Sequence, residues 1–218
     1  MKKTGLLFLS LFITTVSFSQ TDEQAKSLLD EVSTKMASYK NMYIGFSQTL
    51  SNEDAGIKEG DEPPIRGAIN LQGEKYSLNY LGNQFIYDGK KLHIINHDEK
   101  EISISNSDLS GDDGFIYPSK LLTFYKEGYS LQMGKQQNIK GRKIQLVTLN
   151  PIDSNSEIVK VELAIDEKTK HIYKLIQTGA NASKTTFTIT EFKKNENLSQ
   201  NFFTFNKSKY LNKNYTID

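Results

Sequence analysis

The chain has 218 residues, with 27 basic and 26 acidic side chains, 23 tyrosines and phenylalanines together, and no cysteine. This balance argues against nucleic acid or an anionic membrane as the main partner, since both select for dense basic charge. The absence of cysteine excludes disulfides, thiolate nucleophiles, thiolate zinc sites and iron–sulfur clusters. The aromatic content argues against disorder, so the composition indicates a folded, near-neutral protein.

Residues 1–19 have the layout of a secretory signal peptide. Lys2 and Lys3 precede an apolar run, and small residues occupy positions 17 and 19 ahead of a cut before Gln20. A transmembrane anchor is the alternative, but the run is shorter than the roughly 20 residues that span a bilayer. We therefore expect export to the periplasm and a single mature domain over 20–218. Loss of the two lysines changes its formal charge from +1 to −1.

The mature chain is predicted to begin with an amphipathic helix of about 18 residues. Thr21 and Gln24 have the spacing of a capping box. The apolar residues behind them recur at helical spacing and form one stripe. These residues are Ala25, Leu28, Leu29, Val32, Met36 and Tyr39.

From residue 42 the apolar period changes to two. A strand over 42–50 and a long polar loop over 51–64 precede a meander of short strands over 65–105, with a hairpin signal at Asp88-Gly89. A second Gly-rich loop covers 106–117. Pro118 then favours a short helix that buries Leu121, Leu122 and Tyr125 and ends at Gly128.

The second half continues as strands. They are expected at Tyr129–Lys135, Arg142–Leu149, Ile158–Asp166, His171–Thr178 and Lys184–Lys193. No composition shift divides the chain. About ten consecutive antiparallel strands with two or three helices predict a mainly β fold with α (α+β), in which a large, strongly curved sheet carries the helices on its concave side.

Residues that carry chemistry are few. His93, His97 and His171 lack metal-ligand spacing, and we interpret them as solvated or structural rather than catalytic or zinc-binding. Asp108, Asp112 and Asp113 could bind calcium, but they lack regular oxygen alternation and a closing glutamate, so a solvated loop is favoured. We expect no enzyme, no metal and no cofactor. The apolar strands could enclose either an ordinary packed core or a cavity for an apolar ligand.

Several motifs, in order and spacing, make the chain resemble the LolA family of periplasmic outer-membrane lipoprotein carriers. They are Phe46-Ser47-Gln48-Thr49, Gly67-Ala68-Ile69-Asn70-Leu71, Lys75-Tyr76, Asp88-Gly89-Lys90-Lys91-Leu92, Glu101-Ile102, the Pro118-headed helix, Ile165-Asp166 with Thr169 and Ile172, and Phe203-Thr204-Phe205. The resemblance spans essentially the whole mature chain.

The resemblance implies an unclosed antiparallel β-barrel of 10–11 strands with a helical lid over a hydrophobic cavity. Such a protein takes acylated lipoproteins from an inner-membrane release complex to an outer-membrane acceptor, and we expect a monomer. The candidate cavity wall consists of Ile44, Phe46, Ile69, Leu71, Tyr76, Leu78, Phe85, Tyr87, Leu92 and Ile94, with Leu121, Leu122 and Tyr125 from the lid helix. Plain core packing is the alternative for each residue.

The chain departs from the family at one place. Family members carry an arginine just before a proline that ties the wall to the lid, whereas the matching stretch here is Leu71-Gln72-Gly73-Glu74, and Arg66 lies several residues too early. The lid switch is therefore expected to be built differently. A periplasmic lipid-binding or lipoprotein-sensing module on the same scaffold is the main alternative function, and a hydrolase with unrecognised chemistry is the second.

Overall fold

The computed structural model describes residues 17–106 and 120–218. Its elements are α1 (Ser17–Ala37), β1 (Met42–Ser51), β2 (Ile65–Gln72), β3 (Lys75–Tyr80), β4 (Asn83–Tyr87), β5 (Leu92–Asn96), β6 (Glu101–Ser105), the 3-10 helix η2 (Phe124–Lys126), β7 (Tyr129–Ile139), β8 (Arg142–Pro151), β9 (Ile158–Asp166), β10 (His171–Gly179), β11 (Lys184–Lys194), α2 (Lys207–Leu211) and β12 (Thr216–Ile217). The predicted strands are present, with ends that differ by at most two residues except in β7, which continues from the predicted end at Lys135 to Ile139; β12 was not predicted.

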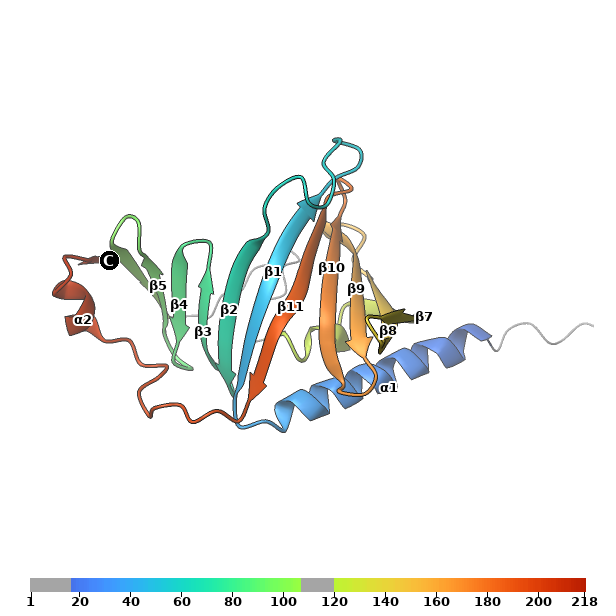
Figure 1. Ribbon diagram of the computed structural model, residues 1–218, viewed down its shortest axis with the longest axis horizontal. Coiled ribbons are helices and arrows are strands. Elements are labelled where there is room, and N and C mark those ends of the chain that lie inside the picture. Colours follow the sequence, from blue (N-terminus) through green and yellow to red (C-terminus); the bar gives the residue numbers. More distant parts are fainter. Residues whose placement is uncertain (1–16, 107–119) are drawn as a thin grey trace, which may run out of the picture.

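One sheet holds all twelve strands of the described residues. Its order is β12-β6-β5-β4-β3-β2-β1-β11-β10-β9-β8-β7, and it is not closed on itself. Neighbouring strands are antiparallel except β12, which lies parallel to β6. Figure 1 shows the strands fanning out from β5 to β7, with α1 along the lower ends of β11, β10 and β9. The expected mainly β fold with an unclosed antiparallel sheet is confirmed.

Local chemistry explains the tight turns between the strands. At the β4–β5 hairpin, Oδ1 of Asp88 accepts hydrogen bonds from the backbone N–H groups of Lys90 and Lys91, each at 2.8 Å. Gly89 occupies a left-handed conformation, φ +94°, that a side chain would disfavour. The Asp-Gly pair therefore fixes the register of two strands that carry four of the predicted wall residues.

The two faces of the sheet have different covers. The apolar stripe of α1 (Ala25, Leu28, Leu29, Val32 and Met36) packs on one face, which we call the α1 face. On the opposite, outer face, residues from β4, β5 and β6 pack against the C-terminal segment 203–217. We expected helices on one face only. The five-residue α2 lies on the other because Tyr210 within it docks between Ile86, Ile95 and Ile102.

Two expected helices differ in the structure. The helix predicted behind Thr21 begins at Ser17, because in the uncleaved chain the preceding residues continue the helical backbone past that cap. Instead of a helix over 118–127, the described part shows turns and the 3-10 helix η2. Four of the five residues 121–125 are apolar. In an α-helix they would point to several sides, so they would not form one stripe that packing on the sheet could bury. Pro118, the three aspartates at 108–113 and most of the predicted signal peptide lie outside the described residues.

Candidate functional site

The predicted wall residues share one face of the sheet. All ten, together with Leu121, Leu122 and Tyr125, belong to the hydrophobic cluster that contains the α1 stripe. Tyr76 and Leu92 are buried, whereas Phe46, Phe85, Tyr87 and Ile94 are half-buried. The alternation of each strand therefore brings apolar residues from β1 to β5 into one cluster with the α1 stripe and the 121–125 segment. The cluster also holds residues that the sequence analysis left out, notably Phe187, Ile189 and Phe192 of β11.

Aromatic rings line the part of this face that α1 does not fill. The ring of Phe46 lies against Gly67, where an added Cβ would stand 2.3 Å from the ring's Cζ. Its centroid lies 5.7 Å from Tyr80 and 5.9 Å from Phe187. Tyr76 and Tyr87 stack at 5.5 Å. Gly67 is thus required for close approach of a ring to the strand, which gives physical meaning to the glycine that opens this sequence motif.

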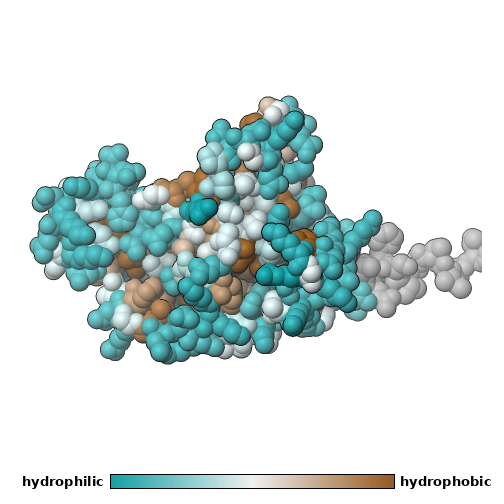
Figure 2. All heavy atoms as spheres, viewed as in Figure 1, coloured by the Kyte–Doolittle hydropathy of each residue, from teal (hydrophilic) through white to brown (hydrophobic). Residues whose placement is uncertain are grey.

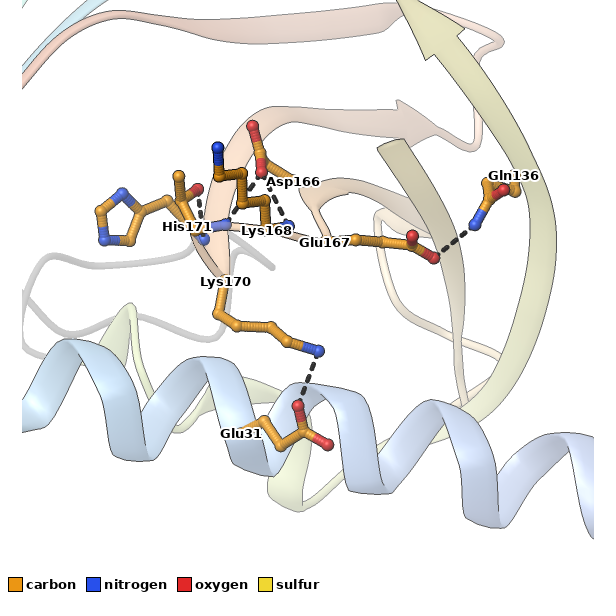
Figure 3. Close-up of polar contacts among 8 residues, drawn as sticks. Glu31, Gln136, Asp166, Glu167, Lys168, Lys170 and His171 are labelled. Atoms are coloured by element: carbon orange, nitrogen blue, oxygen red, sulfur yellow. Dashed lines mark hydrogen bonds and ion pairs between the residues drawn. The ribbon is translucent and has the colours of Figure 1, made fainter. Parts of the chain in front are cut away.

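Polar contacts fasten α1 to the sheet. Figure 3 shows Lys170, in the β9–β10 turn, reaching down to Glu31 of α1, with Nζ and Oε2 2.6 Å apart. The turn itself is held by Oδ1 of Asp166, which accepts from the N–H groups of Lys168 and Thr169. One residue further, Nε2 of His171 lies 2.9 Å from the hydroxyl of Tyr39, just beyond the end of α1.

A third fastening joins the 121–125 segment to α1. The hydroxyl of Tyr125 donates to Oδ1 of Asp30 at 2.8 Å, and Lys26 pairs with the other carboxylate oxygen. Hydrogen bonds from Lys26 and Tyr125 hold the pKa of Asp30 below its usual value. Burial, and then the hydrogen bond to Asp30, raise the pKa of Tyr125 to about 12. This contact therefore keeps its donor and acceptor throughout the physiological pH range.

Arg66, which lies several residues before the position of the family's arginine, does not join α1 to the wall. Arg66 is exposed on β2 and lines a depression with Gly45, Asn79 and Thr190. Lys170, His171 and Tyr125 instead make the contacts with α1 and with Tyr39 behind it. Sequence reasoning missed the partners Asp30 and Glu31, because charged residues on a helix give no signal of what they face. Tyr39 was identified only as the end of the apolar stripe.

The histidines are structural in the described part of the chain. His93 is buried on the outer face, where its ring stacks on Phe205 with centroids 4.3 Å apart. Nδ1 of His97 lies 2.9 Å from the hydroxyl of Tyr215. Within residues 17–106 and 120–218, no three histidine, aspartate or glutamate side chains converge as metal ligands.

Three of the depressions among the described residues lie at the sheet and at α1. They measure about 1270 Å³ between β10 and β11, about 810 Å³ along α1, and about 510 Å³ beside Gly45. Of the predicted wall residues, only Phe46 lines any of these three. These three depressions thus lie mainly beside the predicted wall rather than on it.

None of the helices in the described residues has the length and apolar character that a bilayer crossing requires.

Comparisons with known proteins find likeness in fold at low identity. An uncharacterized conserved protein from Thermus thermophilus aligns with a TM-score of 0.60 and 10% identity, over 89% of this chain and 98% of that one. A DUF1329 family protein from Desulfovibrio piger aligns at 0.50 and 8%, over 87% and 99%. A putative outer membrane lipoprotein-sorting protein domain from Vibrio parahaemolyticus aligns at 0.47 and 12%, over 84% and 97%. A comparison with curated proteins found no match.

The family comparison is more direct. The model of the family described as "Outer membrane lipoprotein carrier protein LolA" matches residues 81–206, more than half of the chain. The match runs from the β3–β4 turn through the last long strand to the start of the C-terminal segment. By this match over more than half of its sequence, the chain belongs to the LolA family.

Proposed function

We propose that this protein is a periplasmic carrier that shields the acyl chains of lipoproteins on its α1 face and moves them from the inner to the outer membrane. Residues 1–19 would direct its export and be removed, leaving one domain over 20–218. An inner-membrane release complex would supply the lipoprotein, and an outer-membrane acceptor would receive it. The protein itself would need no metal, cofactor or bond-breaking chemistry.

One observation carries the proposal beyond family membership. Thirteen residues chosen as wall or lid from the sequence lie in one cluster, and six of them, including Phe85, Tyr87 and Ile94, are only half-buried there. A core built only for stability would bury such large side chains more completely. A face that stays partly open beneath a helix held by polar contacts has the properties that an acyl-binding surface needs.

Magnitudes explain why such a carrier is needed and why it must open. Burial of an acyl chain contributes about 0.8 kcal/mol per methylene, so two or three chains amount to tens of kcal/mol and cannot cross water unshielded. Non-covalent affinities saturate near −18 to −21 kcal/mol, and release from such a complex would be too slow for a carrier. Displacing α1 from the wall would offset part of that binding energy and leave the cargo exchangeable.

The contacts under α1 suit reversible opening. The ion pair between Lys170 and Glu31 is partly exposed, and such pairs contribute about 0–1 kcal/mol. The hydrogen bonds of Tyr39 and Tyr125 each contribute roughly 0.5–1.5 kcal/mol. These contacts add to the burial of the α1 stripe in holding α1 closed, and acyl burial must exceed the two together.

The direct test is native mass spectrometry of the mature protein with a synthetic triacylated lipopeptide. We expect a one-to-one complex with the wild-type chain and its loss in Ile94→Glu, which places a charge on the wall. Ile104→Glu is the matched control, because Ile104 lies on the outer face of the next strand and is exposed. Equal binding by both variants would contradict the assignment of the wall.

The same experiment separates the alternative function. A free lipid that copurifies with the protein, with no lipopeptide complex, would favour a lipid-binding or sensing module. In cells, depletion of a carrier should leave lipoproteins in the inner membrane, whereas depletion of a sensor should leave their location unchanged.

A further inference from the structure

The pairing of β10 with β11 stops partway along the two strands. The two strands pair from Lys174–Thr188 to Thr178–Lys184 and no further. Below Lys174, β10 stays beside β9 as far as His171, while β11 stays beside β1 as far as Lys194. Figure 1 shows the two strands diverging toward their lower ends. The lower parts of β10 and β11 therefore do not pair with each other. Such an interruption is unusual between two long strands in the middle of a sheet.

A cavity of about 1270 Å³ occupies this gap, and its floor is apolar. Ile172 of β10 and Ile189 and Phe192 of β11 line it, are half-buried, and pack against the α1-face cluster. Thr188, which alternates with Ile189, also lines it, so the cavity lies in the gap rather than on one face of the sheet. In Figure 2, hydrophobic atoms appear toward the middle of the face in view, with hydrophilic atoms at both ends.

The rim of this cavity is basic. Five exposed cationic side chains line it, namely Lys140, Arg142, Lys143, Lys168 and Lys194. Lys194 lies over the ring of Tyr39 at 4.7 Å. Within the part of the chain that the structure describes, none of the five forms an ion pair with a carboxylate.

The three acidic residues of the lining are already engaged. Asp166 accepts two backbone N–H bonds of its own turn, and Glu167 accepts a hydrogen bond from Gln136 (Figure 3). Glu191 pairs with Lys193 at 2.8 Å. The lining thus carries five cations against three carboxylates, of which Glu191 is neutralised by Lys193, so a positive excess faces solution next to an apolar floor.

We propose that this gap is a second binding site, which takes a long-chain fatty acid. The carboxylate would lie among Arg142, Lys168 and Lys194, where the guanidinium fork of Arg142 suits two carboxylate oxygens. The hydrocarbon chain would enter between the strands and lie on Ile172, Ile189 and Phe192. This site differs from the wall of the proposed carrier function, since none of the predicted wall residues lines it.

The charge part of the proposal is tested with cis-parinaric acid, a fluorescent fatty acid, and its uncharged methyl ester. We expect micromolar binding of the acid and at least tenfold weaker binding of the ester. The affinity for the acid should fall at least tenfold in a triple variant that carries Arg142→Gln, Lys168→Gln and Lys194→Gln. A control triple variant removes three exposed charges elsewhere, through Lys90→Gln, Lys207→Gln and Lys213→Gln, and its affinity should stay within twofold of wild type. Equal affinity for acid and ester, or equal loss in both triple variants, would overturn it.

The location is tested separately, using the absence of cysteine from the chain. A bimane dye on Thr169→Cys, in the cavity lining, should change its emission when unlabelled oleate is added, and the same dye on Ser103→Cys of β6 should not. Ile94→Glu should remove lipopeptide binding but leave parinarate binding within twofold. If Ile94→Glu instead removes parinarate binding and the basic triple variant keeps it, the fatty acid occupies the wall and the second site is refuted.

Discussion

The two hydrophobic clusters of the sheet have opposite designs. On the outer face, Ile86, Ile95, Ile102 and Tyr210 are buried under the chain's own C-terminal segment, and the ring of Tyr210 stacks on Phe205 at 5.3 Å. The α1 face is larger, mixes buried with half-buried aromatic side chains, and is closed by a helix held through polar contacts. The smaller cluster is thus closed by the chain itself, whereas the larger one is the face that the proposed function requires to open.

The two covering segments differ in how they are attached to the sheet. The C-terminal segment is tied at both sides of its aromatic residues: Tyr210 donates to Gln84 at 3.0 Å, and β12 extends the sheet beside β6. Removal of that segment would expose a sheet edge as well as a core. Movement of α1 would break no strand pairing, so the energetic cost is confined to side-chain contacts.

The largest expected effect contrasts two neighbours on β5. Ile95 points into the outer-face cluster and is fully buried, whereas Ile94 points into the α1 face and is half-buried. Ile95→Ala should lower the free energy of unfolding by about 2–5 kcal/mol, the usual cost of a buried Ile→Ala change. Ile94→Ala should cost clearly less but weaken lipopeptide binding. Urea titration and native mass spectrometry measure both, and the reverse ranking would contradict the comparison.

The next effect concerns close packing on the wall. Gly67→Ala would place a methyl group against the ring of Phe46, and overpacking of this kind costs about 1–3 kcal/mol. The double variant Gly67→Ala, Phe46→Leu should recover part of that loss, because the smaller side chain yields space. Thermal unfolding of the four variants of the cycle gives the coupling, and additive effects would show that the ring does not meet the strand as described.

A smaller effect is expected when α1 is loosened. Tyr125→Phe removes the hydrogen bond to Asp30 and should cost about 0.5–1.5 kcal/mol of stability. Because closure competes with ligand, the same change should raise apparent lipopeptide affinity by roughly 2- to 10-fold. Lys160→Gln is a suitable control, since the ion pair of Lys160 is with Glu162 on its own strand, β9. Lower affinity in Tyr125→Phe would mean that the tyrosine binds ligand rather than fastening the helix.

The smallest effect is a pH dependence at the end of α1. Burial, followed by the nearby charge of Lys194, lowers the pKa of His171. The stability that depends on neutral His171 is therefore present above its ordinary pKa and is lost as the pH falls below it. The free energy of unfolding should decrease as the pH falls from 7.5 to 5, and the decrease should be smaller in His171→Gln than in the wild-type chain. Burial also lowers the pKa of His93, so part of the decrease should remain in that variant.

Much of the fold was predictable because long elements carry a clear period. Alternation over β1 to β5 and β7 to β11 marked the strands, and the stripe from Ala25 to Met36 marked α1. The wall residues followed from the same alternation once a family resemblance suggested which face mattered. The alternation of apolar residues does not show which face of a strand meets the core and which could meet a ligand. Core packing and ligand binding were therefore equally good interpretations of the wall residues.

The features that escaped prediction are short or depend on partners distant in sequence. The five residues of α2 and two of β12 are too few to show a period, yet they close the outer face. The gap between β10 and β11 was not predicted. Register shifts lie beside it, at Ile172/Lys174 in β10 and opposite Gly45/Phe46 in β11, but a local break in alternation does not indicate which neighbouring strands separate. Glu31 and Lys170 form a contact across 139 positions of the chain, which no local pattern encodes.

The most direct test of the account locks α1 in place. Glu31→Cys and Lys170→Cys put two thiols where the native side chains meet, in a chain that has no other cysteine, so a short reducible bis-maleimide can bridge them. The measurement is triacylated lipopeptide binding before bridging, after bridging and after reduction. We predict at least a tenfold loss on bridging and recovery on reduction. Unchanged binding by the bridged protein would show that the ligand does not need α1 to move, and the carrier mechanism proposed for this face would be wrong.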